Sequence, residues 1–132
     1  MDIQRIAIVS VPVSDQDTAI TFYRDVLGLE VVIDSEFAPG MRWVQIRTAV
    51  AGANFSLTTW GPPEAVGSLR GVIVQVDDAH AAADELREMG TAIVREDYDT
   101  PFGHFVEVQD PDGNGIALWE APPGMENSAI TG

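Results

Sequence analysis

The chain has 132 residues, enough for one domain or two small fused modules, and 45% of them are hydrophobic, so a buried core is expected. Seven arginines, no lysine and 21 acidic residues leave a formal charge of −14. This charge repels phosphate backbones and anionic lipid headgroups, and we therefore expect no nucleic-acid or membrane partner. The absence of cysteine excludes disulfide scaffolds, zinc ribbons and thiol nucleophiles.

The order of patterns in the first half predicts a strand, a helix and three more strands. Residues 6–13 form a β-branched run, which predicts the first strand. Ser14 followed by Asp17 resembles a capping box, and apolar residues at helical spacing then continue to Gly28, where the helix is expected to end. Further strands are predicted at residues 29–33, 42–48 and 54–60.

The second half repeats this order. A shift of 62 residues places Asp15 on Asp77 and Gly28 on Gly90. A strand is predicted at 72–76, a helix capped by Asp77 or Asp78 and ended by Gly90, and strands at 92–96, 104–109 and 116–120. The unit βαβββ therefore occurs twice, which predicts an α+β fold.

The connecting segments set the expected boundaries. We expect a first module at 1–61, a linker at 62–69, a second module at 70–121 and a flexible tail at 122–132. Residues 110–114 predict a tight turn between the last two strands. Segments 35–41 and 97–103 carry Pro, Gly and aromatic residues, and they are either flaps over a cavity or plain connectors. The N-terminal residues show no signal-peptide pattern and no apolar run is long enough to span a bilayer, which favours the cytoplasm.

Alternation along the strands separates two sets of side chains. One set is apolar, is expected beneath the helices, and includes Ala7, Val9, Val11, Val44, Ile46, Leu57, Val106, Val108, Ile116 and Leu118. The other set contains all three tryptophans and several polar groups. A solvent-exposed sheet face is one explanation, but aromatic residues with a few polar groups are typical of a small-molecule pocket, and we favour a cavity. The candidate ligand-binding residues from this set are Trp43, Gln45, Arg47, Asn54, Ser56, Thr58, Trp60, Phe105, Glu107 and Trp119.

The sequence offers few candidate catalytic residues. Arg47 and Glu107 are weak catalytic candidates: they either pair with each other, or Arg47 holds an anionic group while Glu107 acts as a base. His80 is predicted on the solvated side of its helix. His104 begins a strand, with either a structural role or a place at the cavity rim.

Several motifs resemble the vicinal oxygen chelate superfamily, which includes glyoxalase I, extradiol dioxygenases and bleomycin resistance proteins. They are Val11-Pro12-Val13-Ser14-Asp15, the segment from Ala19 to Leu29, the helix start Val76-Asp77-Asp78 and the turn Asp110-Pro111-Asp112-Gly113-Asn114. The resemblance implies that the two modules form an incomplete barrel around a cavity with the helices outside. It also implies a homodimer, and it leaves open whether modules pair within or between chains.

The resemblance further implies metal ligands on the first and last strand of each module in the metal-using members. The corresponding positions in this chain are Ile8, Ser56, Gly71 and Ala117, and none offers an imidazole or a carboxylate. Glyoxalase I and dioxygenase activities are therefore not expected, and neither a metal nor another cofactor is predicted.

Three functions compete on these grounds. The leading hypothesis is a metal-free protein that binds or sequesters a planar aromatic compound. The first alternative is a metal-independent isomerase or cyclase with Glu107 as base. The second alternative is a metal-dependent lyase or dioxygenase with atypical ligands.

Overall fold

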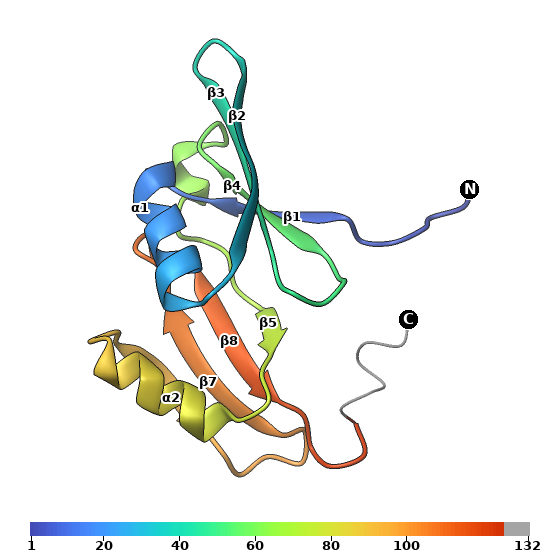
Figure 1. Cartoon of the computed structure of the whole chain (residues 1–132), viewed down its shortest axis with the longest axis vertical. Coiled ribbons are helices and arrows are strands. Elements are labelled where there is room, and N and C mark those ends of the chain that lie inside the picture. The colour runs from blue at the N-terminus through green and yellow to red at the C-terminus, as the bar shows by residue number, and fades with distance from the viewer. Residues whose placement is uncertain (126–132) are drawn as a thin grey trace. The chain divides into compact units, whose positions relative to one another are not determined.

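A computed structural model describes residues 1–125, and these form eight strands, two α-helices, one π-helical segment and one short 3₁₀ helix (Figure 1). They divide into two compact units. Unit 1 comprises Met1–Leu69 together with Asp110–Asn114, and unit 2 comprises Arg70–Gln109 and the chain from Gly115 onward. Of the predicted tail 122–132, residues 126–132 lie outside the described residues.

Unit 1 contains one four-stranded sheet in the order β1-β4-β3-β2. Strand β1 (Ile8–Pro12) leads to helix α1 (Gln16–Ile20), which continues into the π-helical segment η1 (Thr21–Val26). Strands β2 (Glu30–Ala38), β3 (Met41–Arg47) and β4 (Asn54–Thr58) follow, and β4 pairs antiparallel with β3 and parallel with β1. The short 3₁₀ helix η2 (Pro63–Ala65) comes after this sheet.

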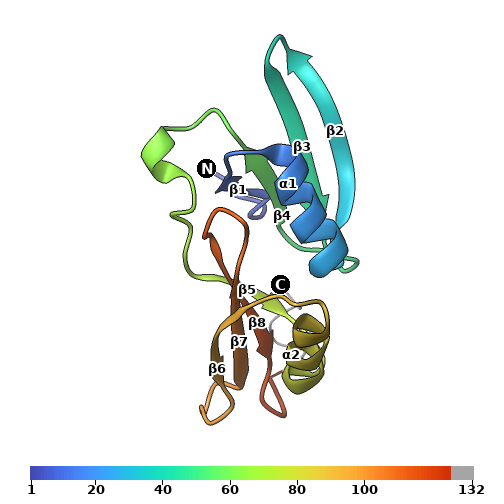
Figure 2. The ribbon, with the colours of Figure 1, turned by 90° about the vertical axis from the view of Figure 1, so that its left-hand side faces the viewer.

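Unit 2 has the same topology, with strand order β5-β8-β7-β6. Its elements are β5 (Val72–Gln75), α2 (Ala79–Glu88), β6 (Ile93–Asp97), β7 (His104–Gln109) and β8 (Gly115–Glu120). Helix α2 lies beside the sheet and packs on β6, β7 and β8 (Figure 2). The predicted α+β fold of two tandem βαβββ modules is therefore confirmed, and each sheet is open rather than closed into a barrel.

The buried faces follow from strand alternation. In unit 1, Val44, Ile46 and Leu57 are fully buried with Tyr23 of η1. In unit 2, Val106, Val108, Ile116 and Leu118 are buried with Ala83 and Leu86 of α2. One member of the predicted apolar set was wrong: Ala7 precedes β1 and is exposed.

The helix starts differ from prediction in unit 1. Asp15, rather than Ser14, caps α1, and its Oδ1 accepts hydrogen bonds from the backbone N–H groups of Asp17 and Thr18. Ser14 donates instead to Asp112, through its hydroxyl at 2.6 Å and its backbone N–H at 3.0 Å. Because the Ser14 hydroxyl is hydrogen-bonded to Asp112, it does not cap the helix. In unit 2, Asp78 is the capping residue of the two that the sequence offered.

The segment at 35–41 is largely a strand rather than a loop. Strand β2 extends to Ala38 and pairs with β3 as far as Met41, which makes a long hairpin (Figure 1). Gly40 turns the hairpin with a φ of 74°, and its N–H donates to Glu36 Oε1. The Pro and Gly signals here mark a two-residue tip, because pairing with β3 extends the strand beyond its β-branched start.

Candidate functional site

A row of four side chains crosses the sheet of unit 2. Ile73 of β5, Ala117 of β8, Glu107 of β7 and Arg95 of β6 are successive partners in the strand register. Their neighbours in sequence, including Val106, Val108, Ile116 and Leu118, are buried with the side chains of α2. Because side chains alternate along a strand, the row lies on the face opposite α2.

Small residues leave this face hollow. Ala117 contributes only a methyl group, and Gly71 and Gly115 contribute no side chain to a hollow of about 380 Å³. This volume is within the range of about 300–1,000 Å³ found for small-molecule pockets. The larger apolar groups lining it are Ile73, Phe102 and Phe105, and the polar ones are Arg95, Asp97, Thr100 and Glu107.

The charged side chains of this hollow differ in whether they have an ion-pair or hydrogen-bond partner. Arg95 Nη2 lies 3.5 Å from Asp97 Oδ2, and the Arg95 side chain is 71% exposed. Glu107 is half-buried, and its carboxylate has no hydrogen bond or ion pair to any group within residues 1–125. Glu107 is thus the carboxylate at this site that has no protein partner among the described residues.

The rim of the hollow is held by a short ordered turn after β6. The Thr100 hydroxyl donates to the Gly103 carbonyl at 2.9 Å and accepts the N–H of Phe102 at 3.0 Å. The Trp119 indole N–H donates to the Phe102 carbonyl at 2.7 Å. These bonds place the Phe102 ring, 66% exposed, at the edge of the hollow. The segment 97–103 is therefore an organised turn at this rim.

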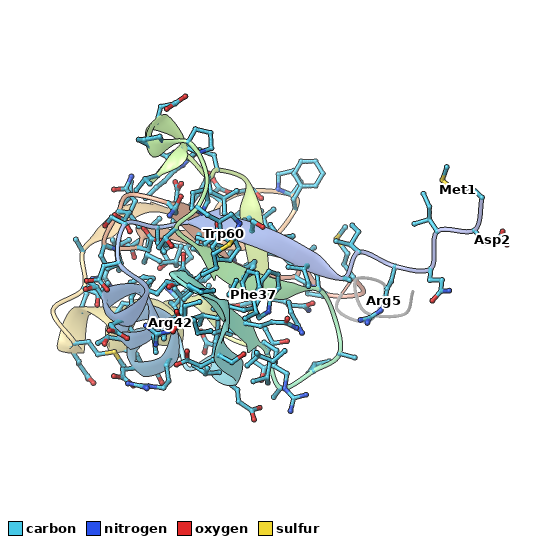
Figure 3. The ribbon with its side chains drawn as sticks, turned by 90° about the horizontal axis from the view of Figure 1, so that it is seen from above. Met1, Asp2, Arg5, Phe37, Arg42 and Trp60 are labelled. Carbon is cyan, nitrogen blue, oxygen red and sulfur yellow. The ribbon has the colours of Figure 1, made fainter. Side chains whose placement is uncertain are left out.

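The predicted aromatic residues of unit 1 form a cluster of their own. Trp43 and Trp60 are stacked, with ring centroids 5.9 Å apart and planes 22° apart. Phe37 meets both edge-on, at 6.4 Å from Trp43 and 6.0 Å from Trp60. Figure 3 shows Phe37 and Trp60 close together, and both are exposed. The Trp43 indole N–H donates to Gln45 Oε1 at 3.0 Å.

The remaining predicted residues of unit 1 lie on β3 and β4. Ser56 and Thr58 are buried, Asn54 is half-buried, and Ser56 Oγ has no hydrogen-bond partner among the described residues. Arg47 Nε lies 3.2 Å from Glu30 Oε2, with both side chains more than half exposed. The ion pair that the structure gives Arg47 is thus with Glu30, its register partner on β2.

The predicted site residues therefore fall into two groups. Trp43, Gln45, Arg47, Asn54, Ser56, Thr58 and Trp60 belong to unit 1, and Phe105, Glu107 and Trp119 belong to unit 2. Phe105 and Glu107 line the hollow, whereas Trp119 holds its rim. Sequence reasoning missed Ile73, Arg95 and Phe102 as lining residues. The alternation of β5 contained a signal for Ile73, but Arg95 is placed only by its pairing with Glu107.

The two histidines of unit 2 meet around a tyrosine. His80 stacks on Tyr98 with ring centroids 3.8 Å apart, and His104 lies edge-on to both rings at 5.5 Å. His80 is exposed, as predicted, but one face of its ring is covered by Tyr98. His104 Nδ1 is buried and lies 3.6 Å from Glu120 Oε2. Glu120 Oε1 accepts the first N–H of α2, from Ala79.

A metal of the kind implied by the resemblance does not fit these residues. Ile8, Gly71 and Ala117 offer no ligand atom, and Ser56 offers only a hydroxyl. Within residues 1–125, no three His, Asp or Glu side chains come together in an arrangement that could hold an ion.

The fold agrees with comparison to known proteins. A model of the Glyoxalase/Bleomycin resistance protein/Dioxygenase superfamily matches residues 5–118, and the chain belongs to this superfamily. Within residues 1–125, no helix combines the length and apolar character that crossing a bilayer requires.

Particular relatives have different described roles. TnmS3, an antibiotic binding protein from Streptomyces sp. CB03234, is 35% identical with a TM-score of 0.85, and the match covers 92% of this chain and 99% of that one. A glyoxalase/bleomycin resistance protein from the same strain is 38% identical with a TM-score of 0.77, covering 86% and 98%. A probable lactoylglutathione lyase of Vibrio parahaemolyticus is 32% identical over 114 residues, which are 80% of this chain and 83% of the relative.

Proposed function

We propose that this protein binds a planar aromatic small molecule and holds it unchanged, without a metal or another cofactor. The observation that carries the proposal is the hollow of about 380 Å³ on the sheet of unit 2. Its lining consists largely of small and apolar residues, with a few polar groups among them. This combination is characteristic of small-molecule sites.

The apolar part of the hollow suits a flat ring system. Phe105 lies on the sheet, Phe102 lies at the rim, and Ile73 borders Ala117. Each favourable ring contact contributes about 0.5–1.5 kcal/mol beyond the area it buries. Two such contacts, together with burial of the ligand, are sufficient for micromolar retention of a flat compound.

One relative supports a binding role. TnmS3, which is 35% identical to this chain, is described as an antibiotic binding protein. The probable lactoylglutathione lyase points toward catalysis, but the four positions where metal-using members hold their ligands are Ile8, Ser56, Gly71 and Ala117 here. A lyase mechanism that needs a metal at these positions has no donor set in this chain.

The test of this function is capture followed by recovery. Anthracenylmethanol, a neutral compound with three fused rings, is dialysed to equilibrium against the protein. The bound compound is then released, and its molecular mass is measured by mass spectrometry. We expect saturable binding at one probe per chain and an unchanged mass. A product of altered mass contradicts the proposal, and so does an absence of saturable binding both for this compound and for charged analogues with the same three rings.

We propose further that the protein is a cytoplasmic homodimer. The remaining candidate ligand contacts all belong to unit 1, and they are Trp43, Gln45, Arg47, Asn54, Ser56, Thr58 and Trp60. The dimer is supported by the family resemblance. Light scattering coupled to gel filtration measures the assembly, and a mass equal to one chain contradicts the dimer. Fractionation of the producing cells tests the location.

A further inference from the structure

We propose that Glu107 determines the specificity of the hollow in unit 2 by selecting flat ligands that carry a protonated nitrogen. This inference rests on the proposed function, because it names the class of ligand taken by the same site. It assigns Glu107 a role in binding rather than the role of a base.

Glu107 is one of the side chains that line the hollow. Glu107 lies beside Ala117 on the floor of the hollow, and it is half-buried. Its carboxylate has no partner within residues 1–125, so in the free protein it depends on water. A ligand that covers the hollow removes that water. Covering a carboxylate with apolar surface alone is costly, whereas a ligand N–H group restores a hydrogen bond.

The neighbouring arginine does not supply this partner. Arg95 is the register partner of Glu107, but its guanidinium lies 3.5 Å from Asp97 and extends into solvent with 71% of the side chain exposed. Moving Arg95 onto Glu107 would leave Asp97 without its ion-pair partner, with only the backbone N–H of Asp99 donating to it within residues 1–125. Arg95, Asp97 and Glu107 together carry one net negative charge.

The remaining polar group of the lining is already engaged. The Thr100 hydroxyl donates its proton to the Gly103 carbonyl, so it is not available as a donor to an anionic ligand. The formal charge of the whole chain, −14, adds to the same preference. Both the local charges and the overall field therefore favour a cation and disfavour an anion at this site.

Three probes of nearly equal shape separate the charge of the ligand from its ring system. Anthracenylmethylamine is a cation at neutral pH, anthracenylmethanol is neutral, and anthracene carboxylate is an anion. We expect the amine to bind the unaltered protein at least about tenfold more tightly than the alcohol, since a hydrogen bond to a charged group is stronger than one between neutral groups. The carboxylate is expected to bind most weakly. Added salt should reduce the preference for the amine, because salt screens partly exposed charges.

Two variants locate the effect. Glu107→Gln keeps the shape and removes the charge, and it should bring the dissociation constant of the amine to within about twofold of that of the alcohol measured on the same variant. Glu85→Gln, on an exposed position of α2, changes the overall charge equally and should keep the full preference. Melting temperatures of both variants show whether they are folded.

The outcomes separate this inference from the proposed function. Equal affinity of the unaltered protein for amine and alcohol, or a preference that survives in folded Glu107→Gln, overturns the inference and leaves the proposed function standing. Loss of the preference in Glu85→Gln also overturns it, because the effect would then belong to the overall charge. If Glu107→Gln does not fold, the salt dependence in the unaltered protein decides: a preference that salt leaves unchanged overturns the inference. Failure of all three probes to bind overturns the proposed function itself.

Discussion

The Tyr23 hydroxyl donates a 2.9 Å hydrogen bond to Asp110 Oδ2, although 87 residues separate the two in sequence. Both residues are buried. Asp110 Oδ2 also accepts the Asn114 side-chain amide, and Oδ1 accepts the backbone N–H groups of Asp112 and Asn114. Four donors thus surround one carboxylate, which is the arrangement that makes a buried charge tolerable. The turn 110–114 is in this way part of the core of unit 1.

Removing the Tyr23 hydroxyl should destabilise the protein markedly. Tyr23→Phe leaves the Asp110 carboxylate with one donor fewer in a buried place, at a cost of about 2 kcal/mol in the free energy of unfolding. Tyr98→Phe is the matched control, because the Tyr98 hydroxyl donates to the more exposed Glu96 at 2.8 Å and its loss should cost less than about 1 kcal/mol. Urea denaturation of both variants measures the difference. Equal losses would contradict the special role of the buried pair.

The two tyrosines should resist ionisation until the protein unfolds in alkali. Burial, followed by the charge of Asp110, raises the pKa of Tyr23 far above its usual value of 10.0. Burial and the hydrogen bond to Glu96 raise the pKa of Tyr98 to about 12. Since the folded pKa values are raised, the native state binds more protons, and stability present below the unfolded pKa of 10.0 is lost as the pH rises towards about 12.

Phenolate absorbance measures this effect directly, because the chain contains only these two tyrosines. Midway between pH 10.0 and about 12, the native protein should show little phenolate, and the same sample in denaturant should show nearly full ionisation. Matching titrations in the two conditions would show that neither hydroxyl is protected.

Gly103 should not accept a side chain. Its φ is +113°, and an added Cβ would lie 2.2 Å from the Glu120 carbonyl oxygen and 2.9 Å from Trp119 Nε1. Gly90 also has a positive φ, +75°, but an added Cβ there meets nothing within 4 Å. Gly90→Ala should therefore cost about 1 kcal/mol from backbone conformation alone, and Gly103→Ala should cost several times more. Thermal or urea unfolding ranks the two, and a smaller loss for Gly103→Ala would show that the rim turn moves freely.

Filling the hollow should abolish binding without unfolding the protein. Ala117→Leu adds three carbon atoms to the middle of the floor, where they occupy the space of the ligand. We expect the affinity for anthracenylmethanol to fall by at least about tenfold, while the free energy of unfolding changes by less than about 1.5 kcal/mol. Ala81→Leu makes the same change on the exposed face of α2 and should leave binding intact. Retained binding in the folded Ala117→Leu variant would place the ligand elsewhere.

Local sequence patterns predicted much of the fold. Helix-ending Gly28 and Gly90, the β-branched strand starts and the Asp-Gly turn each act through neighbouring residues, so the βαβββ order could be predicted from the chain alone. Where a distant residue competes, local reasoning was wrong. Ser14 was predicted to cap the first helix, but its hydroxyl donates a hydrogen bond to Asp112 instead. Segment 35–41 was predicted to be a connector or flap, but pairing with β3 extends strand β2 through most of it.

In the candidate site, too, some features could be predicted from the sequence and others depend on tertiary structure. Alternation by itself determined that Phe105 and Glu107 lie on the face of their strand away from the core, because the period of a strand is a property of the backbone. It did not determine which residues stand beside them. Arg95 next to Glu107, and Ala117 between Glu107 and Ile73, depend on the register between strands, which hydrogen bonds across the sheet decide. The hollow arises from that register, because only there do the small residues Gly71, Gly115 and Ala117 come together.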